Sequence, residues 1–144
     1  MSPKGIRAER DLVHQFWEAG FAVLRSPASG GGTTLPRPDL IVGSKKRNRY
    51  FVIEIKTIRR ETLYINFEQI DGLIEFANRI GFQPLLGIKF KYQRKGFLFL
   101  KVPEQLQDVR NSKNYRVTYA HACTVGKSFG EIIGEFEQKK LVQE

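Results

Sequence analysis

Apolar residues recur at helical spacing in three segments of the chain. They predict helices over residues 5–19, 67–80 and 124–141, and Gly20 is a natural C-terminal stop for the first of them. The predicted apolar stripes are, in chain order, Leu12, Val13 and Phe16; Phe67, Ile70, Leu73, Ile74 and Ala77; and Phe129, Ile132, Ile133 and Phe136. A fourth, short helix is predicted over residues 103–109.

The segments between these helices are short apolar runs rich in β-branched and aromatic residues, which are typical of strands. Glycine, proline and basic residues mark the loops between them: residues 26–38 form a long loop and residues 44–49 a basic turn. The predicted strands cover residues 21–24, 39–43, 50–57, 84–90, 96–102 and 115–119. This order predicts one α/β domain over residues 1–144, with a mixed central β-sheet flanked by helices.

Composition narrows the class of protein. A chain of 144 residues with 41% hydrophobic residues can build an ordinary core. No apolar run approaches the roughly 20 residues of a membrane span, and residues 1–10 have no apolar segment typical of a signal peptide. A single cysteine, Cys123, excludes an internal disulfide and a cysteine-based zinc site. We therefore expect a cytoplasmic protein without a membrane segment.

The charge indicates a polyanionic partner. Lysine and arginine number 24 against 15 acidic residues, which gives a net charge of +9. Such a domain suits nucleic acid, although a solubility surface or a ribosome-type structural protein would have the same balance. Two basic clusters stand out: Lys45, Lys46, Arg47 and Arg49 in the predicted turn, and Lys89, Lys91, Arg94 and Lys95 farther along. The first is either a solvated turn or a contact to a DNA arm, and Lys89 and Lys91 share a strand face and could form a basic stripe.

Candidate chemistry begins in the strand over residues 50–57. Glu54 and Lys56 share one strand face with Val52, because side chains alternate between faces. Burying either charge alone is costly, so each needs a partner or an ion. An exposed salt bridge on a half-buried sheet is the alternative interpretation.

Asp39 supplies a second carboxylate. It opens the preceding strand, and fourteen residues separate it from Glu54, enough for two antiparallel strands and their turn. In such a hairpin Asp39 approaches Glu54 and Lys56, and two neighbouring carboxylates repel unless a cation lies between them. Hard oxygen ligands favour Mg²⁺ or Mn²⁺. A Pro-Asp turn is the alternative for Asp39.

Glu9 is the third candidate carboxylate. It precedes Leu12, Val13 and Phe16 by three, four and seven residues, so it lies on the apolar face of the first predicted helix. A glutamate there fits a metal ligand at the sheet. The alternative is a first-turn glutamate stabilised by the helix dipole.

Together these residues resemble the PD-(D/E)xK nucleases: Pro38-Asp39, fourteen residues, then Glu54-Ile55-Lys56. The surrounding segments Gly-Ile-Arg-Ala-Glu-Arg (5–10), Gly-Phe-Ala-Val-Leu-Arg (20–25), Pro-Ala-Ser-Gly (27–30) and Leu-Ile-Glu-Phe-Ala (73–77) are similar to the archaeal-type Holliday junction resolvases. The resemblance runs from about residue 4 to residue 102. It implies a restriction-endonuclease-like fold and a nuclease domain.

The resemblance also implies roles for residues. Glu9, Asp39 and Glu54 would bind Mg²⁺, for which Mn²⁺ could substitute, and Lys56 would orient or activate the attacking water and stabilise phosphate charge. Ser29 is similar to a serine needed for cleavage, and Gln69 would support the site. The expected DNA-binding residues are Arg7, Arg10, Arg25 and Arg37.

The implied function is metal-dependent hydrolysis of four-way (Holliday) junctions by a homodimer, which makes paired symmetric nicks, one by each subunit. A related nuclease that cuts ordinary duplex is one alternative, although the short chain has no added recognition domain. A non-catalytic DNA-binding module is another, but it would lack one of the four site residues, and all four are present. A sliding clamp is compatible as a protein partner, although no segment identifies one.

Overall fold

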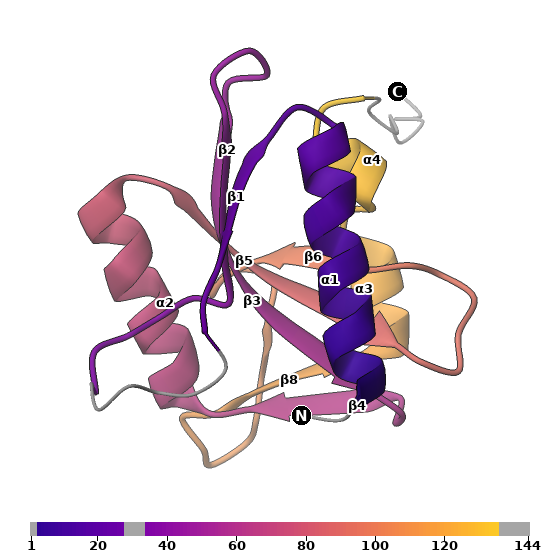
Figure 1. The fold of residues 1–144 in the computed structure, drawn as a ribbon. Helices are drawn as coiled ribbons and strands as arrows, with labels where there is room; N and C mark the ends of the chain where they lie inside the picture. Colours follow the sequence, from indigo (N-terminus) through magenta and orange to yellow (C-terminus); the bar gives the residue numbers. More distant parts are fainter. Residues whose placement is uncertain (1–2, 28–33, 136–144) are drawn as a thin grey trace, which may run out of the picture.

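The computed structural model describes residues 3–27 and 34–135. Its centre is a five-stranded sheet in the order β1-β2-β3-β5-β6 (Figure 1). The strands are β1 (Ala22–Arg25), β2 (Leu40–Ser44), β3 (Arg49–Ile58), β5 (Gln83–Phe90) and β6 (Leu98–Lys101). Neighbouring strands run antiparallel except β3 and β5, which are parallel. The sheet is therefore mixed, as the sequence predicts.

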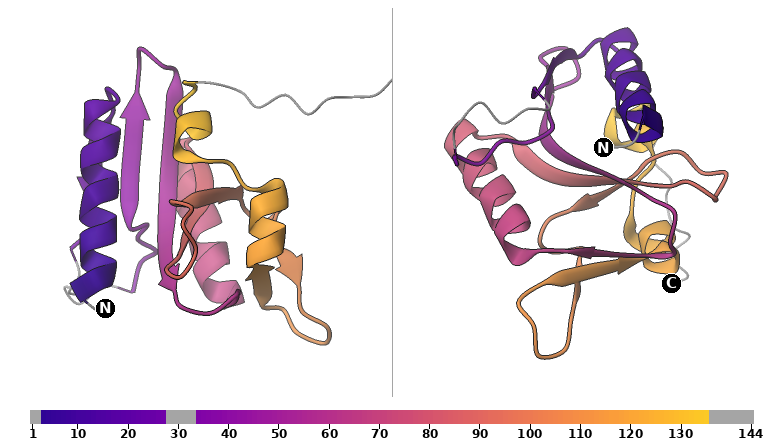
Figure 2. Two further views of the ribbon diagram at one scale, coloured as in Figure 1. Left: turned by 90° about the vertical axis from the view of Figure 1, so that its right-hand side faces the viewer. Right: turned by 60° about the horizontal axis from the view of Figure 1, so that its bottom comes forward.

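Helices cover both faces of this sheet (Figure 2). Helix α1 (Pro3–Glu18) places Leu12 and Phe16 in one core cluster, which also contains Ile53 and Ile55 of β3. Helix α2 (Phe67–Ile80), the crossover between the parallel strands, belongs to the other cluster, which contains Val52. The two faces of β3 thus build two cores because successive side chains point to opposite sides. The bounds of α2 agree with the prediction, and Gly81, with φ 81°, ends it in a left-handed conformation.

A small second sheet, in the order β4-β8-β7, adds to the predicted architecture, and of its strands only β8 corresponds to a predicted one, over residues 115–119. It contains β4 (Thr62–Ile65), β7 (Gln107–Asp108) and β8 (Tyr115–Thr118). Leu63, Ile65 and Val117 face the α2 cluster, and this burial stabilises strands too short to stand alone. The predicted helix over residues 103–109 is wrong: turns and β7 occupy this segment, because Gln107 and Asp108 pair with β8.

The predicted helix over residues 124–141 is also wrong in its extent. Helix α3 (Tyr119–Val125) ends at Gly126, and helix α4 (Phe129–Ile132) follows a short extended link. Lys127 in this link pairs with Phe99 of β6, and Ser128 begins α4 with a capping box. Cross-strand pairing and this cap therefore interrupt the apolar pattern that resembles one helix. Phe136 and the rest of the predicted helix lie outside the described residues.

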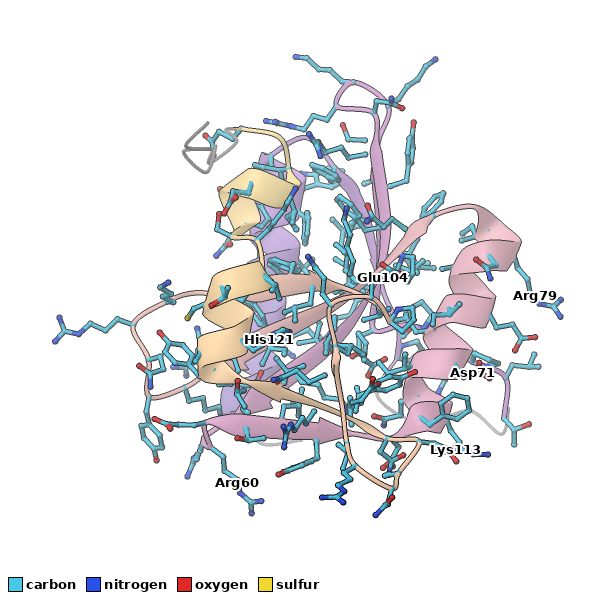
Figure 3. The ribbon with its side chains drawn as sticks, turned by 180° about the vertical axis from the view of Figure 1, so that it is seen from behind. Arg60, Asp71, Arg79, Glu104, Lys113 and His121 are labelled. Atoms are coloured by element: carbon cyan, nitrogen blue, oxygen red, sulfur yellow. The ribbon has the colours of Figure 1, made fainter. Side chains whose placement is uncertain are left out.

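The surfaces of the fold are rich in charge. Figure 3 shows Arg60, in the turn after β3, and Arg79, on α2, extending away from the body of the protein. Arg79 forms an exposed ion pair with Glu75 one turn earlier, with 3.3 Å between Nη2 and Oε1. Within the two described ranges, no helix is long and apolar enough to cross a membrane.

Candidate active site

Asp39 and Glu54 meet across the β2–β3 hairpin. Leu40 pairs with Ile53, so the same register puts Asp39, one residue before β2, opposite Glu54. The backbone N–H of Ile55 donates to Asp39 Oδ2 over 2.7 Å and fixes this carboxylate against β3. The hairpin predicted from the fourteen-residue spacing therefore brings the two carboxylates together.

Glu54 and Lys56 lie side by side on one face of β3. Lys56 Nζ is 3.9 Å from Glu54 Oε1, and the two side chains are 27% and 17% exposed. Burial, reinforced by the neighbouring Asp39 carboxylate and more weakly by Glu9, raises the pKa of Glu54 to about 8, although Lys56 acts in the opposite direction. Glu54 therefore carries a proton near neutral pH until a cation compensates the negative charge.

Glu9 is buried under α1, as its position on the apolar stripe predicts. Its side chain is only 4% exposed, and Arg25 Nε of β1 donates to its Oε1 over 3.0 Å. Its other oxygen, Oε2, is buried and has no hydrogen-bond partner among the described residues. A buried carboxylate oxygen without a partner is costly, and such exceptions are common at functional sites.

These carboxylates are neighbours but not yet a formed ligand set. Within the described ranges, no group of three acidic, histidine or cysteine side chains is positioned to hold a metal ion as it stands. The residues nevertheless fit a hard divalent cation, because Glu9 Oε2 has no partner among the described residues and the pKa of Glu54 is raised by burial and by the carboxylates beside it. Oxygen donors of this kind suit Mg²⁺ or Mn²⁺.

A pocket of about 290 Å³ opens beside Glu54. Gln69 of α2 and Arg37 line it together with Glu54, so the structure brings both predicted residues to the site. The segment before β2 contacts α2 at Gly72, where a Cβ atom would come within 3.3 Å of Pro36 Cβ. Ser29, the predicted loop serine, lies outside the described residues.

The remaining predicted DNA-binding residues divide into two groups. Arg7 and Arg10 are exposed on α1 and free to meet a polyanion. Arg25 is half-buried on Glu9 instead of pointing into solvent. Sequence reasoning assigned Arg25 only to phosphate and missed this contact. The available signal was that β1 follows α1 directly, so its arginine can reach back to the buried glutamate.

A mixed sheet that holds two carboxylates and a lysine on paired strands, beside a glutamate from a flanking helix, is typical of nucleases of the PD-(D/E)xK class. Residues 1–141 match the family described as archaeal Holliday junction resolvase (Hjc), and the chain belongs to this family. This confirms the resemblance noted in the sequence, including the restriction-endonuclease-like fold.

Individual relatives agree along nearly the whole chain. The crossover junction endodeoxyribonuclease Hjc of Archaeoglobus fulgidus is 31% identical over 98% of this chain and 97% of its own length. The enzyme of the same name from Methanocaldococcus jannaschii is 36% identical over 96% of this chain and 92% of its own. The 1.6 Å structure of A. fulgidus Hjc, a Holliday junction resolvase from an archaeal hyperthermophile, superimposes with a TM-score of 0.77 at 30% identity, covering 94% of this chain and 99% of that one.

Proposed function

We propose that the chain, as one nuclease domain over residues 1–144, is a metal-dependent endonuclease that cuts four-way DNA junctions with paired symmetric nicks. The observation that carries the proposal is the crowding of Asp39, Glu54 and Glu9 beside Lys56. Negative charge here is in excess, since the pKa of Glu54 rises to about 8 and Glu9 Oε2 has no partner among the described residues. A divalent cation would compensate this excess, and a phosphate could then bind between that cation and Lys56.

Glu9, Asp39 and Glu54 would hold Mg²⁺, and Mn²⁺ could substitute because both prefer oxygen ligands. When bound, such an ion acidifies water and stabilises charge on the phosphate. The Ile55 N–H and Arg25 keep Asp39 and Glu9 oriented. Lys56 is a point charge close enough to Glu54 to orient water or to bind a phosphate oxygen.

Other residues would act on the substrate around this centre. Gln69 and Arg37 border the pocket beside Glu54 and are suited to contact the DNA strand being cut. Arg7, Arg10 and Arg25 would bind backbone phosphates, which contribute affinity without sequence information. In this proposal Arg25 also neutralises Glu9. Ser29 keeps its proposed role in cleavage by resemblance.

A homodimer would place two such centres about a two-fold axis and so produce two symmetric nicks. Recognition of a four-way junction would then rest on DNA shape and backbone rather than base sequence. With DNA as its substrate and a free thiol at Cys123, the protein would act in the cytoplasm, and a sliding clamp is a protein partner compatible with this role.

The test compares a synthetic four-way junction with a linear duplex of matching sequence, with and without Mg²⁺. Asp39→Asn and Glu54→Gln are assayed beside Glu75→Gln, which makes the same chemical change in the exposed ion pair of α2. We expect paired nicks in the junction only, dependent on Mg²⁺ and absent in the two site variants. Equal cutting of the duplex would indicate a general nuclease. Junction binding without cleavage in any metal would leave a binding module.

A further inference from the structure

A second, basic pocket lies at the carboxyl ends of the parallel strands β3 and β5. Thr57 of β3 pairs with Lys89 of β5, and the Lys91 N–H donates to the Ile58 carbonyl over 2.8 Å, so the pairing continues to the strand ends. Alternation places Arg59 on the same face as Thr57, and Lys91 on the same face as Lys89. These side chains border a cavity of about 330 Å³, together with Ala8 and Tyr92.

The lining of this pocket carries only positive charge. It contains three cationic side chains, Arg59, Lys89 and Lys91, and no acidic residue. Arg59 and Lys89 form no ion pair with any other described residue, and Lys89 Nζ lies 5.9 Å from the centre of the Phe97 ring. Like charges gathered around a cavity repel one another unless an anion binds between them. A phosphate group, with its several acceptor oxygens, suits such a set of donors.

The rim of the pocket adds an aromatic side chain. Tyr92 is 74% exposed although it is large and partly apolar. An exposed ring next to cationic side chains suits a nucleic acid backbone, because the ring can pack against the sugars while the cations hold the phosphates. A free inorganic anion would make no use of this ring, so the lining favours a phosphate of a nucleic acid strand.

The pocket is adjacent to the acidic site but distinct from it. Thr57 directly follows Lys56, and Ala8 directly precedes Glu9, yet the side chains of Thr57 and Lys56 point to opposite faces of β3. The path along β3 from Glu54 to Thr57 is roughly 10 Å, at about 3.3 Å per residue. The rise of about 3.4 Å per nucleotide along the duplex axis is shorter than the path from phosphate to phosphate along one strand, so this separation corresponds to fewer than three nucleotides.

We propose that this pocket of Arg59, Lys89, Lys91 and Tyr92 binds one backbone phosphate of the DNA strand, a few nucleotides from the phosphate that is cleaved, and thereby sets the position of the cut. The proposal rests on the junction-nuclease function for its substrate. Besides adding affinity, the pocket would prevent the substrate strand from sliding past Lys56 and Glu54.

The test uses junctions in which one phosphate at a time is replaced by a neutral methylphosphonate, and binding is measured in Ca²⁺ so that cleavage is not needed. For the natural sequence, we expect one substitution, within about three nucleotides of the cleaved phosphate, to weaken binding about threefold to tenfold. In Arg59→Ala/Lys89→Ala the same substitution should cause little further loss, because the two changes remove one interaction. Without the modification, this variant should also show a salt dependence weaker by about one to two phosphate contacts.

Lys45→Ala/Lys46→Ala is the matched control. It also removes two positive charges, but at the β2–β3 turn, which lies at the opposite end of β3 in Figure 1. This control should keep its sensitivity to the critical methylphosphonate and, in Mg²⁺, a single cutting position. Arg59→Ala/Lys89→Ala should instead distribute its cuts over neighbouring phosphates. Inorganic phosphate at millimolar concentration should not displace the junction from the natural protein, whereas displacement would indicate a site for the free anion.

Unchanged methylphosphonate sensitivity and one cutting position in Arg59→Ala/Lys89→Ala would overturn the proposal, even if the protein cuts junctions as expected. Failure of the junction-nuclease function has a different signature: no cleavage in any metal, or equal cutting of duplex. In that case the methylphosphonate pattern in Ca²⁺ still shows whether the pocket binds a strand phosphate. Circular dichroism of each variant verifies that a change in cutting position comes from folded protein.

Discussion

The charged side chains at the two ends of the β2–β3 hairpin lie in opposite environments: they have partners at the turn and repel one another at the open end. At the turn, Arg47 donates through Nε to the Ala19 carbonyl at the end of α1 and through Nη1 to the Ile133 carbonyl at the end of α4. At the open end, Asp39 and Glu54 approach each other, and Glu9 keeps one buried oxygen without a partner among the described residues.

The turn end of the hairpin therefore contributes to stability, and the open end contributes to function. A cation at the carboxyl ends of two helices satisfies free carbonyls and the helix dipoles, so the turn is stabilised as it stands. The open end is the reverse, since like charges are brought together in a half-buried place. Uncompensated charges in a half-buried place are expected at functional sites, where a bound ligand supplies the opposite charge.

The largest expected effect is on catalysis at the open end. Asp39→Asn or Glu54→Gln should reduce single-turnover cleavage of a junction by about a thousandfold or more, because each removes a proposed metal ligand. Junction binding should change little. Glu75→Gln, an exposed glutamate of α2, should cut at the normal rate. Cleavage by Asp39→Asn within tenfold of the natural protein would exclude Asp39 from the metal site.

The second prediction concerns pH and the metal-free protein. Because the pKa of Glu54 rises from 4.5 to about 8 on folding, the folded state binds the proton more tightly than the unfolded state. This contribution to stability is fully present below pH 4.5 and is lost as the pH rises through about 8. Urea unfolding should therefore show a free energy of unfolding that falls, on the order of 2 kcal/mol, over this range.

Glu54→Gln mimics the protonated carboxyl and separates this effect from other titrations. The variant should match the natural protein near pH 5 and exceed its stability at pH 8. If Glu54→Gln and the natural protein were equally stable at both pH values, ionisation of Glu54 would not destabilise the folded state. The open end would then differ less from the turn.

The third effect lies at the turn. Arg47→Ala should lower the free energy of unfolding by about 1 kcal/mol, since two helix ends lose a charged donor. Single-turnover cleavage, measured well below the unfolding temperature, should not change. Lys46→Ala, in the same turn, should leave the stability within about 0.5 kcal/mol of the natural protein. A larger loss of cleavage than of stability in Arg47→Ala would give this end a part in function.

The smallest effect is expected for Gln69→Ala. Gln69 borders the pocket with Glu54 but lies on α2, so its loss should slow cleavage by about threefold to tenfold. Asn78→Ala, another exposed amide of the same helix, is the control and should have no effect. Identical cleavage rates for the two variants would remove Gln69 from the site.

The fold was predictable from the sequence wherever a local pattern of apolar residues was sufficient to define a helix or a strand. The bounds of α2 follow from its stripe and Gly81, and β3 follows from its run of β-branched and aromatic residues. The small sheet was missed because β4 has only four residues and its pairing with β8 joins segments about fifty residues apart. The long predicted C-terminal helix failed because the Lys127–Phe99 bridge is a long-range contact that a local pattern does not contain.

For the site, local spacing in the sequence predicts two features. Glu54 and Lys56 share a face because strand geometry repeats every two residues, and Glu9 is buried because it lies on the apolar stripe of α1. The partners of these charged side chains, in contrast, follow from the tertiary fold. It set Asp39 opposite Glu54, turned Arg25 back onto Glu9, and joined the ends of β3 and β5 into a basic pocket. These contacts depend on which strands pair and in which register. The free energy of pairing is distributed over the whole sheet, so no single segment of the sequence determines it.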